Sequence, residues 1–341
     1  MKRQKKIFKV IKSILIILVG VFLVGIVWNG ICGISEQERL EKAYGQLVEV
    51  NGKNMTVEIF NQNLEGPVIV LLPGWGCASP VLEFKPLAER LADDYTVIII
   101  EPFGYGLSDE TDQERTVETI TGELRQCILE LGYKEYYLMG HSIAGLYCLY
   151  WANAYPKEVK GFIGIDPSVP HMTDDENEPF PISTTTLNKF SAYAGKAMNL
   201  TGISRLLSIG DPKKSVYADF SYSYTEEELE IFRLLSIDKA YNSTVMNELD
   251  CMSKNLLMLE DYKFPEETPV LEFVSKENCQ IMPAWEKLHR DTLAKEGEIQ
   301  VLEGPHYLHF EQKDKIISES LKWIQKLEED QKAKAGQEII E

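Results

Sequence analysis

The chain has 341 residues, of which 35 are lysine or arginine and 53 are aspartate or glutamate, and its formal net charge is −18. So acidic a protein repels phosphate, which argues against nucleic acid as a partner. Hydrophobic residues make up 44% and charged residues 26% of the chain, as is usual for a globular protein. The six cysteines include no C-x-x-C pair, so we predict neither a disulfide framework nor a zinc site.

The chain opens with a basic tip followed by a long apolar run. Residues 1–12 hold six basic side chains and no acid, and residues 14–34 carry no charge over 21 positions. A helix needs about 20 apolar residues to cross a bilayer, and basic flanks stay in the cytoplasm. We therefore predict a cytoplasmic tip and single-pass membrane anchor over residues 1–35, with the catalytic part outside the cytoplasm. A cleaved signal peptide is the alternative, although the run is long for one.

Strand-like and helix-like segments alternate from residue 45 to residue 167. Asn51-Gly52 stands between two alternating segments, 46–50 and 54–60, and predicts a β-hairpin. Solid apolar runs predict strands buried on both faces, at 68–72, 96–100, 136–139 and 161–165. Amphipathic segments between them predict helices, at 80–92, 116–131 and 143–154. The alternation predicts an α/β fold with a mostly parallel sheet flanked by helices.

The alternation of strand-like and helix-like segments stops over residues 168–264, which contain helical segments at 225–237 and 244–259. An insertion this long in a compact domain should be folded and functional, so we predict a helical cap over the active face. The core pattern resumes over residues 265–328, with strands at 268–274 and 298–302 and helices at 282–294 and 316–327. The charged residues after 328 are expected to fray.

Ser142 lies between a predicted strand and a predicted helix. Such a serine stands on a sharp backbone turn that needs small residues two positions to either side, and Gly140 and Ala144 meet this need. The amide of Ile143 would open the following helix, where unpaired N–H groups stabilise a developing negative charge. Ser142 is therefore a candidate nucleophile, although a serine hydroxyl is weak until a base takes its proton.

The candidate base is His306, one of five histidines. It follows the last predicted strand, and reacting groups in an open parallel sheet gather beyond the carboxyl ends of the strands. His141 adjoins Ser142, but its side chain should point away from the tip of the turn. His306 and His309 have a spacing that could suit a metal, but no carboxylate–histidine motif accompanies them, so we predict no metal site.

Four segments, in this order, resemble the α/β-hydrolase superfamily in its capped esterase and epoxide-hydrolase-like branch. They are Pro73-Gly74-Trp75-Gly76, residues 101–108, Gly140-His141-Ser142-Ile143-Ala144 and residues 304–309. The likeness covers about residues 45–328. It implies that the amides of Trp75 and Ile143 form an oxyanion hole and that Ser142 forms an acyl-enzyme with His306 as base. It implies no cofactor, and serine in place of aspartate at the turn argues against dehalogenase or epoxide-hydrolase chemistry.

The same resemblance leaves the acidic partner of the histidine open. The usual position falls on Asn278, which carries no charge, and Glu277 stands one place early. Some members of the superfamily use an acid at the end of the preceding strand, where this chain has Asp166. We predict Asp166 as the acid, with Glu277 as the alternative.

The sequence thus predicts a membrane-anchored serine hydrolase that cleaves a small or lipid-like ester. Pro73, Glu101 and Asn278 depart from the usual pattern of the superfamily, which favours a second hypothesis of a catalytically silent hydrolase fold that binds a ligand. An amide-cleaving peptidase or a perhydrolase would use the same three side chains.

Overall fold

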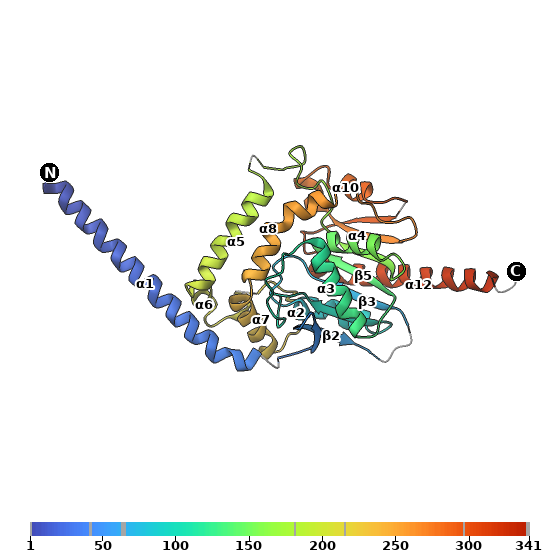
Figure 1. The fold of residues 1–341 in the computed structure, drawn as a ribbon, viewed down its shortest axis with the longest axis horizontal. Coiled ribbons are helices and arrows are strands. Elements are labelled where there is room, and N and C mark those ends of the chain that lie inside the picture. Colours follow the sequence, from blue (N-terminus) through green and yellow to red (C-terminus); the bar gives the residue numbers. More distant parts are fainter. Residues whose placement is uncertain are drawn as a thin grey trace.

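The structure is a computed structural model that describes residues 2–40, 43–62, 66–180, 182–214, 216–295 and 297–338. Within these residues the strands form one eight-stranded sheet in the order β1-β2-β4-β3-β5-β6-β7-β8 (Figure 1). The strands are β1 (Gln46–Val50), β2 (Lys53–Phe60), β3 (Val68–Leu72), β4 (Thr96–Glu101), β5 (Tyr136–His141), β6 (Val159–Ile165), β7 (Val270–Ser275) and β8 (Glu298–Leu302).

Two kinds of strand pairing build this sheet. Strand β1 pairs antiparallel with β2, and β2 pairs antiparallel with β4. From β4 to β8 every neighbouring pair is parallel. The β1–β2 turn holds Asn51 at φ 53° and Gly52 at φ 76°, the left-handed conformations that a tight hairpin needs. The predicted hairpin is therefore confirmed.

Helices cover both faces of the sheet. The helical segments are α1 (Lys2–Leu40), α2 (Pro80–Leu91), α3 (Val117–Glu130), α4 (Ala144–Ala154), α5 (Thr184–Leu200), α6 (Ile203–Leu207), the 3-10 helix η1 (Pro212–Lys214), α7 (Glu226–Asp238), α8 (Ser243–Met258), α9 (Lys276–Ile281), α10 (Trp285–Asp291), α11 (Leu308–Glu311) and α12 (Lys313–Glu338). Successive strand residues point to opposite faces: Val70 and Leu72 pack with α3 and α4, and Ile69 and Leu71 pack with α2 and α12. Burial on both faces explains the solid apolar runs of the sequence.

Helices α5 to α8, here called the cap, are inserted between β6 and β7. They lie between the sheet and α1 (Figure 1). Hydrogen bonds join the cap to loops of the core. The Trp75 indole donates to the Val245 carbonyl (3.0 Å), and the side-chain amide of Asn242 donates to the Gly104 carbonyl (2.5 Å). Both core loops follow sheet strands, so the cap is held over the edge where those strands end.

Helix α1 projects from the body, and its C-terminal part lies beside α6 and α7 (Figure 1). The segment Lys6–Leu40 is long and apolar enough to cross a membrane, with a mean hydropathy of 2.9 over its most apolar window and none of that window buried. Arg205 of α6 holds the end of α1 through Asn29 (3.0 Å) and Glu36 (2.6 Å). Length and composition alone make α1 a candidate span.

One helix was not predicted from the sequence, and two expectations were wrong in detail. Residues 276–281 form helix α9, because Ser275 caps it by accepting a hydrogen bond from the Asn278 amide (3.1 Å). The helix expected at 282–294 is confined to α10, since Met282 precedes a proline and is extended. Helix α12 continues to Glu338, so residues 329–338 are helical; residues 339–341 lie outside the described part. Apolar residues of α12 that dock on the sheet hold this helix from its first turns.

Candidate active site

The turn after β5 carries Ser142 in the left-handed conformation, with φ 54°. A side chain on Gly140 would come within 3.2 Å of the Ala144 methyl group and the Cys148 sulfur. The turn is therefore closed to larger residues at this position, for the steric reason that the sequence suggested. The Ser142 carbonyl accepts hydrogen bonds from the amides of Gly145 (2.9 Å) and Ser168 (2.7 Å), which fix the turn.

Ser142, His306 and Asp166 form one chain of hydrogen bonds. The Ser142 Oγ lies 2.8 Å from the His306 Nε2, and the His306 Nδ1 lies 2.6 Å from the Asp166 Oδ2. These residues come after strands β5, β8 and β6, so the carboxyl edge of the sheet brings them together. The His306 side chain is 32% exposed, whereas Asp166 is fully buried.

The carboxylate of Asp166 is held by four donors. Its Oδ1 accepts from the Ser275 amide (2.8 Å) and the Trp285 indole (2.9 Å), and its Oδ2 accepts from His306 and the Asn278 amide group (2.5 Å). Burial alone raises the pKa of Asp166, but the hydrogen bond and charge of His306, together with the other donors, hold that pKa below its ordinary value. An ionised Asp166 keeps the His306 proton on Nδ1 and leaves Nε2 free to accept from Ser142.

The two other residues considered for the acid lie on α9. Glu277 is exposed, and within the described residues it makes no hydrogen bond or ion pair to the site. The Nδ2 atom of Asn278 lies 3.4 Å from the His306 Nδ1 and donates a hydrogen bond to the Asp166 carboxylate. The structure therefore places Asp166 beside His306 and leaves Glu277 apart. The sequence analysis did not predict the supporting roles of Asn278 and Trp285. The uncharged Asn278 at the usual position of the acid was the feature of the sequence that could have indicated its role.

Trp75 and Ile143 line the same cavity as Ser142 and His306. Within the described residues, neither main-chain amide donates a hydrogen bond to the protein. The Trp75 ring is held by the cap, so the residue is fixed through its side chain. A Cβ on Gly74 would lie 3.1 Å from the Ser142 Cβ and 2.8 Å from the His141 Nδ1. Only glycine lets this loop approach the serine so closely.

A cavity of about 480 Å³ opens above Ser142, between the core and the cap. Its floor holds Ser142 and His306, and its upper wall includes α5. Most of the remaining lining is apolar or aromatic, from Met172, Phe180, Met252, Met282 and Tyr307 among others. An apolar pocket with a few convergent polar groups is typical of a small-molecule site.

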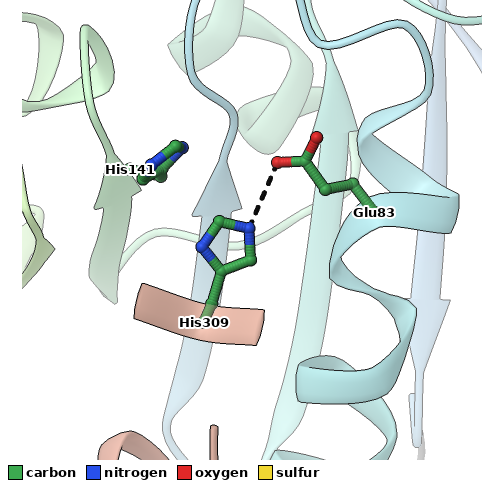
Figure 2. A group of neighbouring side chains, drawn as sticks. All are labelled: Glu83, His141 and His309. Atoms are coloured by element: carbon green, nitrogen blue, oxygen red, sulfur yellow. Dashed lines mark hydrogen bonds and ion pairs between the residues drawn. The ribbon is translucent and has the colours of Figure 1, made fainter. Parts of the chain in front are cut away.

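Three buried side chains lie behind this site: Glu83, His141 and His309 (Figure 2). The His141 Nε2–H donates to the His306 carbonyl (3.2 Å), and the His309 Nε2 lies 3.3 Å from the Glu83 carboxylate. Possible metal-ligand atoms of the three lie within 4.8 Å of one another. The two contacts engage the Nε2 atoms of His141 and His309, whereas the buried Nδ1 atoms of both have no hydrogen-bond partner among the described residues. We interpret the group as a support for the His306 loop. We expected the His141 side chain to point away from the tip of the turn, and His141 is not among the residues that line the cavity.

Burial lowers the pKa of His141 well below its ordinary value, and the neighbouring His309 and His306 lower it further. The ring is therefore neutral in the folded protein.

The order of the strands and the site at their carboxyl ends define the α/β-hydrolase fold, and this chain has that fold. A family model for the alpha/beta hydrolase fold matches residues 67–213. Among solved structures, a haloalkane dehalogenase loop variant from Bradyrhizobium elkanii superposes with a TM-score of 0.59 at 16% identity, covering 85% of this chain and 98% of that one. At such low identity the likeness shows the fold alone.

Two relatives by sequence extend the comparison. The chain is 26% identical to the uncharacterized protein YbdG of Bacillus subtilis (strain 168) over 340 residues, which is 95% of this chain and 100% of that protein. It is 31% identical over 148 residues to a pimeloyl-(acyl-carrier protein) methyl ester esterase of Shewanella woodyi. That match covers 42% of this chain and about half of the esterase, 53%.

The buried, neutral His141 predicts a loss of stability in acid. The unfolded chain takes up a proton at an ordinary histidine pKa of about 6.5, whereas the folded protein does not. Stability therefore falls as the pH drops below about 6.5. We expect His141→Gln to show a smaller fall in Tm between pH 7.5 and pH 5 than the unchanged protein, measured by differential scanning calorimetry.

His171 provides a control of opposite sign. Its hydrogen bond to Asp174 raises the pKa of His171, so the exposed His171 adds stability as the pH falls through this range. His171→Gln should therefore steepen the fall in Tm. Equal falls in the unchanged protein and in His141→Gln would contradict a neutral His141.

Proposed function

We propose that this protein is a serine hydrolase that cleaves a carboxylic ester through an acyl-enzyme intermediate. The observation that carries the proposal is the hydrogen-bonded chain from Ser142 through His306 to Asp166, with spacings of 2.8 Å and 2.6 Å. These are the distances and roles that an activated serine nucleophile requires.

In the first half of the reaction, the Ser142 Oγ attacks the ester carbonyl carbon while the His306 Nε2 takes the hydroxyl proton. The carbonyl oxygen becomes an oxyanion that accepts hydrogen bonds from the amides of Trp75 and Ile143. Asp166 stabilises the imidazolium. His306 then gives its proton to the leaving alcohol oxygen, which breaks the ester bond and leaves an acyl group on Ser142.

In the second half, water attacks the acyl carbon as His306 takes one of its protons. The same two amides hold the second oxyanion. Collapse of this intermediate returns the proton to the Ser142 oxygen and releases the carboxylic acid. No cofactor enters these steps.

Several observations favour an ester hydrolase over a silent binding module. Two of the three departures from the usual pattern have defined contacts: Asn278 donates to the Asp166 carboxylate, and the buried Glu101 accepts hydrogen bonds from Tyr44 (2.9 Å) and the Leu107 amide (2.6 Å). The partial match to a methyl ester esterase supports ester substrates. Peptidase or perhydrolase activity stays an alternative, because the same three side chains serve each.

The proposal includes a location and a substrate type. We propose that α1 anchors the protein in a membrane with its basic tip in the cytoplasm and its hydrolase core on the other side, supported by length, apolarity and charge. The apolar lining of the cavity above Ser142 supports a small or lipid-like ester.

The nucleophile is tested by Ser142→Ala. We expect a fluorophosphonate probe to label the unchanged protein and not the variant, and turnover of p-nitrophenyl acetate to fall at least about a thousandfold. A folded unchanged protein that the probe does not label would favour the silent binding module. A panel of p-nitrophenyl esters and aminoacyl amides separates an esterase from a peptidase.

The acid is tested by comparing Asp166→Asn with Glu277→Gln. The first should lower kcat about a thousandfold or more, because the histidine loses its charged partner, and the second should change it less than about twofold. The double variant Asp166→Asn/Asn278→Asp restores one carboxylate near His306 and should recover at least about tenfold of the loss. A larger effect of Glu277→Gln would overturn the assignment.

The anchor is tested by fractionating cells that express the full chain. An α1 that spans the bilayer predicts that the protein stays with membranes after washes in high salt and at alkaline pH, and leaves them only in detergent. Release of a shortened protein into the medium would instead mean a cleaved signal peptide.

A further inference from the structure

The cap lies against α1 within the apolar run itself. A Cβ on Gly25 would come within 2.4 Å of the Thr201 carbonyl oxygen, and one on Gly202 within 3.0 Å of the Trp28 ring. At 1.5 Å per residue, the helix between Gly25 and Ile34 rises roughly 14 Å. If residues 14–34 span a bilayer, the cap residues beside Gly25 and Trp28 must lie below the surface of that bilayer.

This part of the cap exposes apolar side chains. The exposed set, here called the α6 edge, is Leu200 (53%), Ile203 (44%), Leu206 (55%), Leu207 (61%) and Ile209 (66%). In water such a contiguous group is unfavourable, whereas in the hydrocarbon of a leaflet it is favourable. The charged residue among them, Arg205, is buried and forms ion pairs with Glu36 (2.6 Å) and Asp238 (3.0 Å).

A second cavity, of about 520 Å³, is lined both by residues of the α6 edge region and by residues next to the active site, and its lining includes the charged side chains of Glu83 and Lys214. Ser204 and Leu207 line it on the side of α6, and Trp75, whose amide is a candidate oxyanion donor, also lines it. Trp75, Tyr241 and Tyr307 line both this cavity and the one above Ser142. The two cavities therefore share a wall beside the candidate nucleophile.

We propose that the α6 edge is immersed in the bilayer leaflet on the side of the membrane that carries the hydrolase core. The ester substrate is then an amphipathic, long-chain ester that enters from this leaflet through the second cavity. The inference rests on the proposed hydrolase function and adds the class and source of its substrate. The continuity of the α6 edge with the apolar run of α1 selects a bilayer as the occupant. A second copy of the chain is the competing occupant.

Immersion is tested directly, without reference to activity. The full chain is reconstituted in phosphatidylcholine vesicles with and without bromine on the acyl chains, which quenches tryptophan at hydrocarbon depth. Leu206→Trp should add tryptophan fluorescence to that of the parent protein, and the brominated lipids should strongly quench this added fluorescence. Leu257→Trp is the matched control, since Leu257 is 66% exposed on the last turn of α8 and should add fluorescence that these lipids do not quench. Equal quenching of the two added signals would overturn the proposal.

Substrate entry is tested with Leu206→Asp and its control Leu257→Asp. We expect Leu206→Asp to lower hydrolysis of a long-chain p-nitrophenyl ester in the vesicles about tenfold, because a charge is disfavoured in hydrocarbon. Hydrolysis of soluble p-nitrophenyl acetate should stay within about twofold, and Leu257→Asp should leave both rates unchanged. Equal effects on both esters, or none, would overturn entry from the leaflet.

The outcomes separate this inference from the function on which it rests. If the unchanged protein neither hydrolyses any ester nor is labelled by the fluorophosphonate probe, the hydrolase proposal is wrong. Normal turnover of the soluble ester together with an unquenched Leu206→Trp would end only the membrane inference. A dimer in detergent that Leu206→Asp converts to a monomer would assign the α6 edge to self-association and likewise overturn it.

Discussion

The hydrogen bond between Asp166 and His306 is the contact on which the arrangement of the site depends. It joins residues 140 positions apart in the chain and holds the loop after β8 against the end of β6. Because the carboxylate is buried and accepts from four donors, it has one position and one charge state near neutral pH. The imidazole then has one tautomer, and its second nitrogen meets the Ser142 hydroxyl.

Asn278 stands where the resemblance to α/β-hydrolases would place the acid, and in this structure it supports Asp166. The amide group of Asn278 reaches the same neighbourhood as an acid at that position would, but it donates to Asp166. In this chain the buried carboxylate beside His306 belongs to Asp166, and Asn278 supports it. Trp285, on the short helix α10, closes the remaining side of the carboxylate with its indole N–H.

The cap connects the candidate anchor to the candidate active site. Helix α5 borders both cavities, one near its start and the other near its end, where the chain turns into α6 and meets α1. The indole of Trp75 ties the oxyanion loop to α8 of the same cap. Helix α5 thus joins the part of the cap beside α1 to the wall above Ser142.

The amino-acid sequence by itself determined the features that depend on neighbours in the chain. The pattern of apolar residues predicted the parallel sheet and its helices, because it records which faces of each element are buried. Asn51-Gly52 predicted the hairpin, and Gly140 with Ala144 predicted the turn at Ser142, because both follow from local backbone sterics. Only the tertiary structure decided which acid meets His306, how Asn278 is used, and how α1 lies against the cap. These depend on contacts between residues more than a hundred positions apart, which no local pattern records.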